Sequence, residues 1–154
     1  MLNVKYSKSA DWMMLIGAVV VTVLFIIFAA PVYNMFYIGS DAFDEEMYNS
    51  NMYLSLSVIT CCVVWCVAIL YYWVIDSVPL SNFGMWSLFC LITIALCCGL
   101  CFYFPWSSFD EANLDFSSDL SILALIEIPI ALVLFLVTCI AAKRLSRNCS
   151  TKPF

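Results

Sequence analysis

The sequence predicts an all-α membrane protein, folded as an antiparallel bundle of four transmembrane helices. Three observations lead to this prediction: 65% of the 154 residues are hydrophobic, only 11% are charged, and long apolar stretches follow one another along the chain. A soluble domain is about half apolar and about a quarter charged, so the surplus apolar surface must face lipid. The net charge of −5 argues against nucleic-acid binding, which needs a basic face.

Four stretches have the roughly 20 apolar residues that a spanning helix needs. We predict a single domain, 1–154, with spans at about 12–33, 53–75, 83–104 and 120–142. Two outer loops are expected at 34–52 and 105–119, and a short inner turn at 76–82. Several tyrosines and a tryptophan near the outer ends fit an interfacial aromatic belt, namely Tyr33, Tyr37, Tyr53, Tyr103 and Trp106.

The basic residues predict the orientation of the bundle. All six lie near the termini, at Lys5, Lys8, Lys143, Arg144, Arg147 and Lys152. The positive-inside rule therefore places both ends, including a basic tail at 143–154, in the cytoplasm. An even number of spans requires the same arrangement. On size and compactness, a bacterial cytoplasmic (inner) membrane is favoured over a eukaryotic one.

The two outer segments resemble each other. Phe43-Asp44-Glu45 and Phe109-Asp110-Glu111 are 66 residues apart, and one ungapped alignment of 36–56 with 102–122 contains seven identities. One interpretation is a duplicated helical hairpin, with a pseudo-twofold axis along the membrane normal. The other is a chance match between two interfacial segments of similar composition.

The third span contains Ala95 and Gly99, two small residues four positions apart. Such a pair lets one membrane helix approach a neighbour closely. We therefore expect these two residues to form a helix-packing site.

Glu127 is the only charged residue predicted to lie inside a span. An intramembrane carboxyl group is costly and suggests a function. Pro129 has no N–H, so it leaves the carbonyl of Leu125 without its helical hydrogen bond. The Glu127 carboxyl group and this carbonyl together would form a binding site for a cation or a proton. The alternative is structural, with Glu127 hydrogen-bonded to a neighbouring helix.

Acids dominate both outer segments, and no basic residue balances them there. Eight of the eleven acids belong to this set: Asp41, Asp44, Glu45, Glu46, Asp110, Glu111, Asp115 and Asp119. They would attract cations to a pore mouth, bind Ca²⁺ or dock a basic partner. They would equally form a plain solvated surface. The repeated Phe-Asp-Glu triplets are the candidate contact residues.

Nine cysteines are present, and Cys98 and Cys101 have C-x-x-C spacing near the outer end of the third span. This short pattern resembles that of four-helix, quinone-coupled thiol oxidoreductases, which implies a redox role. Such enzymes need thiols in water, where thiolates form, and the outer loops contain no cysteine. Cysteine also packs well in membrane helices as a small apolar residue.

We find no phosphate loop, no Ser-His-Asp set and no histidine for a metal motif. We therefore expect no enzyme activity, cofactor or metal. The leading hypothesis is a small membrane protein that binds another membrane protein or its own copies, as an accessory, assembly or immunity-type subunit. The alternatives are an oligomeric cation channel or pore-forming effector, and a thiol or quinone redox protein.

Overall fold

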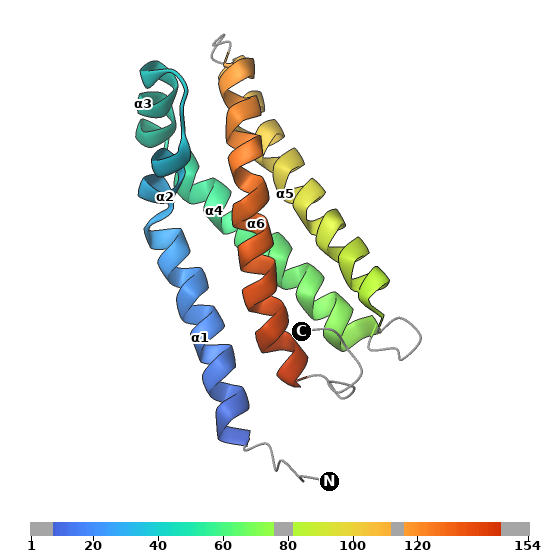
Figure 1. Cartoon of the computed structure of the whole chain (residues 1–154). Helices are drawn as coiled ribbons and strands as arrows, with labels where there is room; N and C mark the ends of the chain where they lie inside the picture. The colour runs from blue at the N-terminus through green and yellow to red at the C-terminus, as the bar shows by residue number, and fades with distance from the viewer. Residues whose placement is uncertain (1–7, 76–81, 112–115, 146–154) are drawn as a thin grey trace.

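A computed structural model describes residues 8–75, 82–111 and 116–145, and all regular structure in these ranges is helical (Figure 1). The elements are α1 (Lys8–Ile27), α2 (Ala29–Phe36), α3 (Asp41–Asn49), α4 (Met52–Ile69), the π-helix η1 (Leu70–Ile75), α5 (Phe83–Glu111) and α6 (Ser117–Leu145). Among them, Met52–Trp73, Phe83–Asp110 and Ser117–Lys143 are long and apolar enough to cross a membrane. The bent pair α1–α2 makes a fourth if it counts as one span. The fold therefore fits a multi-pass helical membrane protein.

The first expected span is broken. Helices α1 and α2 meet at an angle of 71° around Phe28. Pro31 lies in the first turn of α2 and has no N–H to donate. The N–H of Phe28 still bonds the oxygen of Leu24 at 2.9 Å, and that of Val32 bonds the oxygen of Phe28 at 3.1 Å. The chain thus turns sharply while these two N–H groups stay paired.

The segments expected to be outer loops are largely helical, which corrects the prediction. Residues 34–52 contain the end of α2 and all of α3, while α5 runs through Pro105 to Glu111. Asp41 and Asp44 lie in the first turn of α3, where their negative charges interact favourably with the positive end of the helix dipole and stabilise the helix. Helix α3 lies outside the candidate spans, whereas 105–110 and 117–119 continue the long helices α5 and α6.

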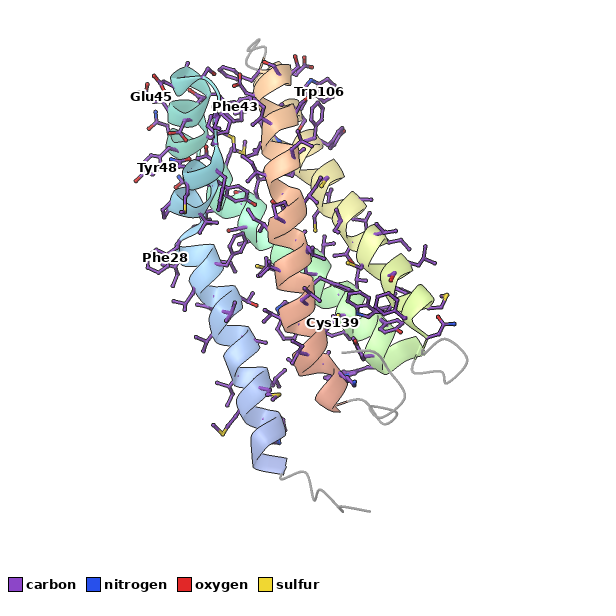
Figure 2. The ribbon with its side chains drawn as sticks, in the orientation of Figure 1. Phe28, Phe43, Glu45, Tyr48, Trp106 and Cys139 are labelled. Atoms are coloured by element: carbon purple, nitrogen blue, oxygen red, sulfur yellow. The ribbon has the colours of Figure 1, made fainter. Side chains whose placement is uncertain are left out.

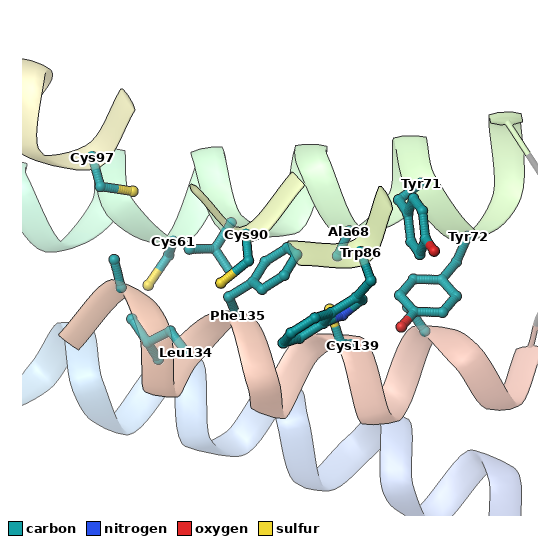
Figure 3. Packing of buried hydrophobic residues seen from close by; sticks show 13 residues of the cluster. Cys61, Ala68, Tyr71, Tyr72, Trp86, Cys90, Cys97, Leu134, Phe135 and Cys139 are labelled. Carbon is teal, nitrogen blue, oxygen red and sulfur yellow. The ribbon is translucent and has the colours of Figure 1, made fainter. Parts of the chain in front are cut away.

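Helices α4, α5 and α6 pack on one another, and α1 packs mainly on α6 (Figure 1). At the end of the bundle where α1 begins and α6 ends, Trp86 and Phe135 lie with ring centroids 5.8 Å apart, next to Cys139 (Figure 3). The π-helix η1 buries two consecutive residues, Tyr71 and Tyr72, in the same cluster. Cysteines here pack as apolar side chains among aromatic rings.

A second cluster lies at the α3 end of the bundle. The Phe43 ring contacts Phe109 and Phe116 edge-on, with centroids 5.8 and 5.3 Å away. Both phenylalanines of the repeated triplets are therefore buried against each other. Their backbones differ, however, because Phe43 lies in the separate helix α3 and Phe109 within the uninterrupted α5. The helices do not reproduce two matched hairpins.

Replacing Phe43 with Ala should destabilise the protein strongly. The side chain is fully buried between α3, α5 and the start of α6, and truncation of such a ring costs about 3–5 kcal/mol. We expect a clear drop in the SDS fraction needed to unfold the purified protein in mixed micelles. The matched control is Phe28→Ala, because Phe28 is 53% exposed. Equal effects of the two substitutions would contradict the cluster.

Candidate functional site

Glu127 lies in the middle of the bundle with 0% of its surface exposed. The hydroxyl of Tyr33 in α2 donates to Oε2 at 2.6 Å, and the hydroxyl of Thr60 in α4 donates to Oε1 at 2.5 Å. Each carboxyl oxygen therefore has one hydroxyl donor. The group joins three helices that are far apart in the sequence.

Helical spacing explains why these three residues meet. On α6, Leu123, Glu127 and Ala131 are four positions apart and all fully buried, so the acid lies on the face that packs inward. Thr60 occupies the buried face of α4 between Leu56 and Val64. Tyr33 reaches Glu127 from α2, beyond the bend. A hydroxyl donor from each neighbour compensates the cost of burying the acid.

The side chain of Pro129 faces a different side of α6 from Glu127. Pro129 is exposed and lines a groove between α1, α2 and α6, whereas Glu127 points to α2 and α4. Among the described residues no group of three Cys, Asp, Glu or His side chains is placed to hold a metal ion. The arrangement around Glu127 is that of a hydrogen-bonded tie between helices.

Two further carboxylates at the α3 end of the bundle also accept from tyrosines. Asp119, at the start of α6, accepts from the Tyr37 hydroxyl at 2.6 Å and from the backbone N–H of Ser40 at 3.0 Å. Asp44 accepts from the Tyr53 hydroxyl at 2.6 Å. Burial and the neighbouring Asp119 raise the pKa of Tyr37 above its ordinary value, so it stays protonated and keeps donating at neutral pH.

Gly39 belongs to the same corner. A Cβ built on it would collide with the ring and hydroxyl of Tyr37 and lie 2.5 Å from Oδ1 of Asp119. The chain between α2 and α3 therefore passes close to the Tyr37–Asp119 hydrogen bond, and only glycine fits there without moving these side chains.

The repeated Phe-Asp-Glu triplets divide into buried and exposed parts. Phe43 and Phe109 belong to the core, and Asp44 is partly buried in its hydrogen bond with Tyr53. Glu45 and Asp110 are exposed. Figure 2 shows Phe43 directed to the bundle and Glu45 and Tyr48 directed away from it. The side chain of Glu111 lies outside the described residues, as does Asp115.

The cysteine pair lies within the helix bundle. The thiol of Cys98 donates to the backbone oxygen of Ala124 at 3.4 Å, and Cys101 is 2% exposed in the cluster around Phe43. The cysteines that the structure describes are all free thiols. Cys101 is buried and Cys98 is half-buried against α6, which gives the redox alternative no support, because thiolates form readily only where water or positive charge is near.

Ala95 and Gly99 lie on an exposed face of α5. A Cβ added at Gly99 would meet no atom within 4 Å. The expected close approach to a neighbouring helix is therefore absent from the described part of this chain, which corrects that prediction. The pair remains a candidate contact for a second molecule only.

The sequence pattern did not identify Tyr33 and Thr60 as the partners of Glu127. The sequence places Tyr33, Tyr37 and Tyr53 in an interfacial belt, yet the hydroxyl groups of all three donate to carboxylates. The sequence contains one signal for them, because a carboxyl group within a span needs donors, and hydroxyl side chains on the other spans can provide them.

Comparisons with protein families, curated proteins and solved structures find no match to this chain.

The Tyr33→Phe substitution should weaken the bundle by removing one donor from Glu127. Hydrogen bonds between membrane helices contribute about 0.6 kcal/mol on average and up to about 1.7 kcal/mol. We expect a loss in this range in SDS unfolding of the purified protein. Tyr103→Phe is the control, since Tyr103 is 61% exposed. If both variants unfold at the same SDS fraction as the wild type, the hydrogen bond contributes no stability.

Proposed function

We propose that this chain is a non-enzymatic, multi-pass membrane protein that acts by binding another protein through α3. The observation that supports this most is the position of α3, a nine-residue helix outside the candidate spans. One of its faces is anchored by Phe43 and Met47, both 0% exposed. The opposite face leaves Asp41, Glu45 and Tyr48 exposed.

A surface of this kind is suited to recognition. Its backbone is held by the buried face, so little ordering is needed when a partner binds. Tyr48 is 66% exposed, and tyrosines commonly contribute strongly to protein interfaces. Asp41 and Glu45 have no basic neighbour in the outer segments, so the complementary partner carries lysine or arginine.

The cation-channel alternative receives less support. It needs Glu127 or the outer acids to border a water-filled path. Glu127 is fully buried and both its oxygens accept hydrogen bonds from Tyr33 and Thr60. A pore between several copies would therefore depend on the exposed acids of α3 and on Asp110, and not on the intramembrane carboxyl group.

Partner binding can be tested with a photo-crosslinking amino acid in place of Tyr48, and, as the control, in place of Tyr103 on α5. We expect a crosslinked product with one discrete second polypeptide from position 48 only. Its yield should fall at high salt, because exposed charge pairs are screened. Glu45→Lys should abolish it, while Asp110→Lys should leave it unchanged. Products that are equal at both positions, or insensitive to Glu45→Lys, would reject α3 as the docking face.

The proposed orientation keeps both termini in the cytoplasm, with α3 on the other side of the membrane. It rests on the six basic residues near the ends and on an even number of spans, with α1–α2 counted as one. A bacterial cytoplasmic membrane is our working assignment, on size and compactness.

Epitope tags provide the test of orientation. A tag inserted after Ser50, which is exposed between α3 and α4, should be digested by protease added to intact cells or spheroplasts. Tags at either terminus should be digested only after the membrane is permeabilised. Digestion of a terminal tag in intact cells would contradict the positive-inside assignment.

A further inference from the structure

A cavity of about 300 Å³ lies where α3 is followed by α4, beside the bend between α1 and α2. Its lining includes Met47 and Tyr48 of α3, Tyr53 and Leu54 of α4, and Pro31 of α2. Figure 2 shows Tyr48 on the same side of the molecule as Glu45 and as Phe28 at the bend. The cavity therefore adjoins the exposed face of α3, and Tyr48 belongs to both.

The lining of the cavity has an apolar part and a polar part. Apolar side chains come from both sides of the bend and from α4, as Ile27, Pro31 and Leu54 illustrate. The polar groups are those of Tyr48, Asn51 and Tyr53. Small-ligand sites range from about 300 to 1,000 Å³ and combine apolar walls with a few polar groups. The cavity is at the lower end of this range, so it suits a single group with an apolar stem and a polar end.

The polar part of the lining favours positive charge. The hydroxyl of Tyr53 lies 2.6 Å from Oδ1 of Asp44, and Glu45 is exposed three positions before Tyr48, which makes these two side chains neighbours on the helix surface. The last turn of α3 ends at Asn49, beside Asn51, and carries no basic residue to offset the negative end of the helix dipole. Tyrosine rings also attract cations. The polar end of the occupant is therefore expected to be cationic.

Neither this chain nor a lipid supplies a matching cation readily. No lysine or arginine occurs between Ser9 and Ala142, so with both termini in the cytoplasm a second copy has none to offer at α3. The cationic group of a zwitterionic lipid is joined to a phosphate, which the acids of α3 repel. Lysine and arginine side chains combine an apolar stem with a cationic end and carry no neighbouring anion.

We propose that this cavity receives a lysine or arginine side chain of the protein that docks on α3. The stem lies against Ile27, Pro31 and Leu54, and the cationic end meets the Tyr48 ring and Glu45. This inference rests on the proposed function and adds to it the residue type by which the partner is anchored. A side chain that enters a pocket at the centre of a contact commonly contributes much of the binding energy.

The first experiment uses the purified full chain in an uncharged maltoside detergent, with N-acetyl-arginine amide as the probe and saturation-transfer NMR as the measurement. The neutral isostere N-acetyl-citrulline amide is the matched probe. Leu54→Trp fills the cavity from an exposed position, and Tyr48→Leu removes a ring. Leu91→Trp and Tyr103→Leu are the controls, since both residues are exposed on α5 and neither lines the cavity.

We expect the arginine amide to bind the wild type and both controls, and the citrulline amide to bind none of them. Leu54→Trp should abolish binding, and Tyr48→Leu should weaken it roughly two- to fivefold, as expected for an exposed cation–π contact. Equal binding of the citrulline amide, or full binding by both cavity variants, would overturn the site. Tighter binding of phosphocholine than of the arginine amide would overturn it in favour of a lipid headgroup.

Photo-crosslinking from position 48 separates this inference from the proposed function. The product with the partner should be lost when Leu54→Trp is added and kept when Leu91→Trp is added. A product that persists with Leu54→Trp would reject the cavity as the anchor while docking on α3 stands. If position 48 yields no product in the otherwise unaltered chain, the proposed function itself fails. A product made of two copies of this chain would overturn the assignment of a lysine or arginine side chain.

Discussion

The burial of one carboxyl group constrains the architecture of this protein. An acid with no exposed surface, deep in an apolar bundle, requires donors for both oxygens. Glu127 obtains them from Tyr33 and Thr60, and these lie on α2 and α4 while Glu127 lies on α6. Three helices must therefore approach to hydrogen-bonding distance at a single depth. The bend between α1 and α2 is consistent with this requirement, because it directs the short helix α2 to the acid.

The same pairing of tyrosine with carboxylate recurs towards the α3 end of the bundle. Tyr37 ties the end of α2 to Asp119 of α6, and Tyr53 ties α4 to Asp44 of α3. Phe43 and Phe109 are buried in the same cluster as Tyr53, so apolar packing and these hydrogen bonds together organise the polar end of the bundle. Helix α3 is held by its inner face only. The outer face carries the exposed Asp41, Glu45 and Tyr48, and the apolar groove lies along the bend between α1, α2 and α6.

Composition and charge predicted the apolar helices well, because hydrocarbon demands about 20 apolar residues regardless of the neighbours. Glu127 was recognisable for the same reason, as an acid within such a stretch. The broken first span was not predictable from proline alone. Pro31 lies beside a 71° bend, whereas Pro105 and Pro129 lie inside the continuous helices α5 and α6. Whether a proline breaks a helix depends on what the next segment packs against, and that information is tertiary.

The repeated triplets illustrate the same limit and sharpen the functional proposal. Identical residues in Phe-Asp-Glu have unequal roles, since Asp44 is engaged by Tyr53 while Asp110 is exposed. A carboxylate that already accepts two or three hydrogen bonds has little left to offer another molecule, because a new contact must displace an existing one. Recognition is therefore expected from the exposed acids Asp41 and Glu45, which accept no hydrogen bond from the part of the chain that the structure describes, and not from the triplet as a motif. Among the residues that the structure describes, the acids thus include hydrogen-bonded groups that hold the helices together and exposed groups that are available to the proposed basic partner.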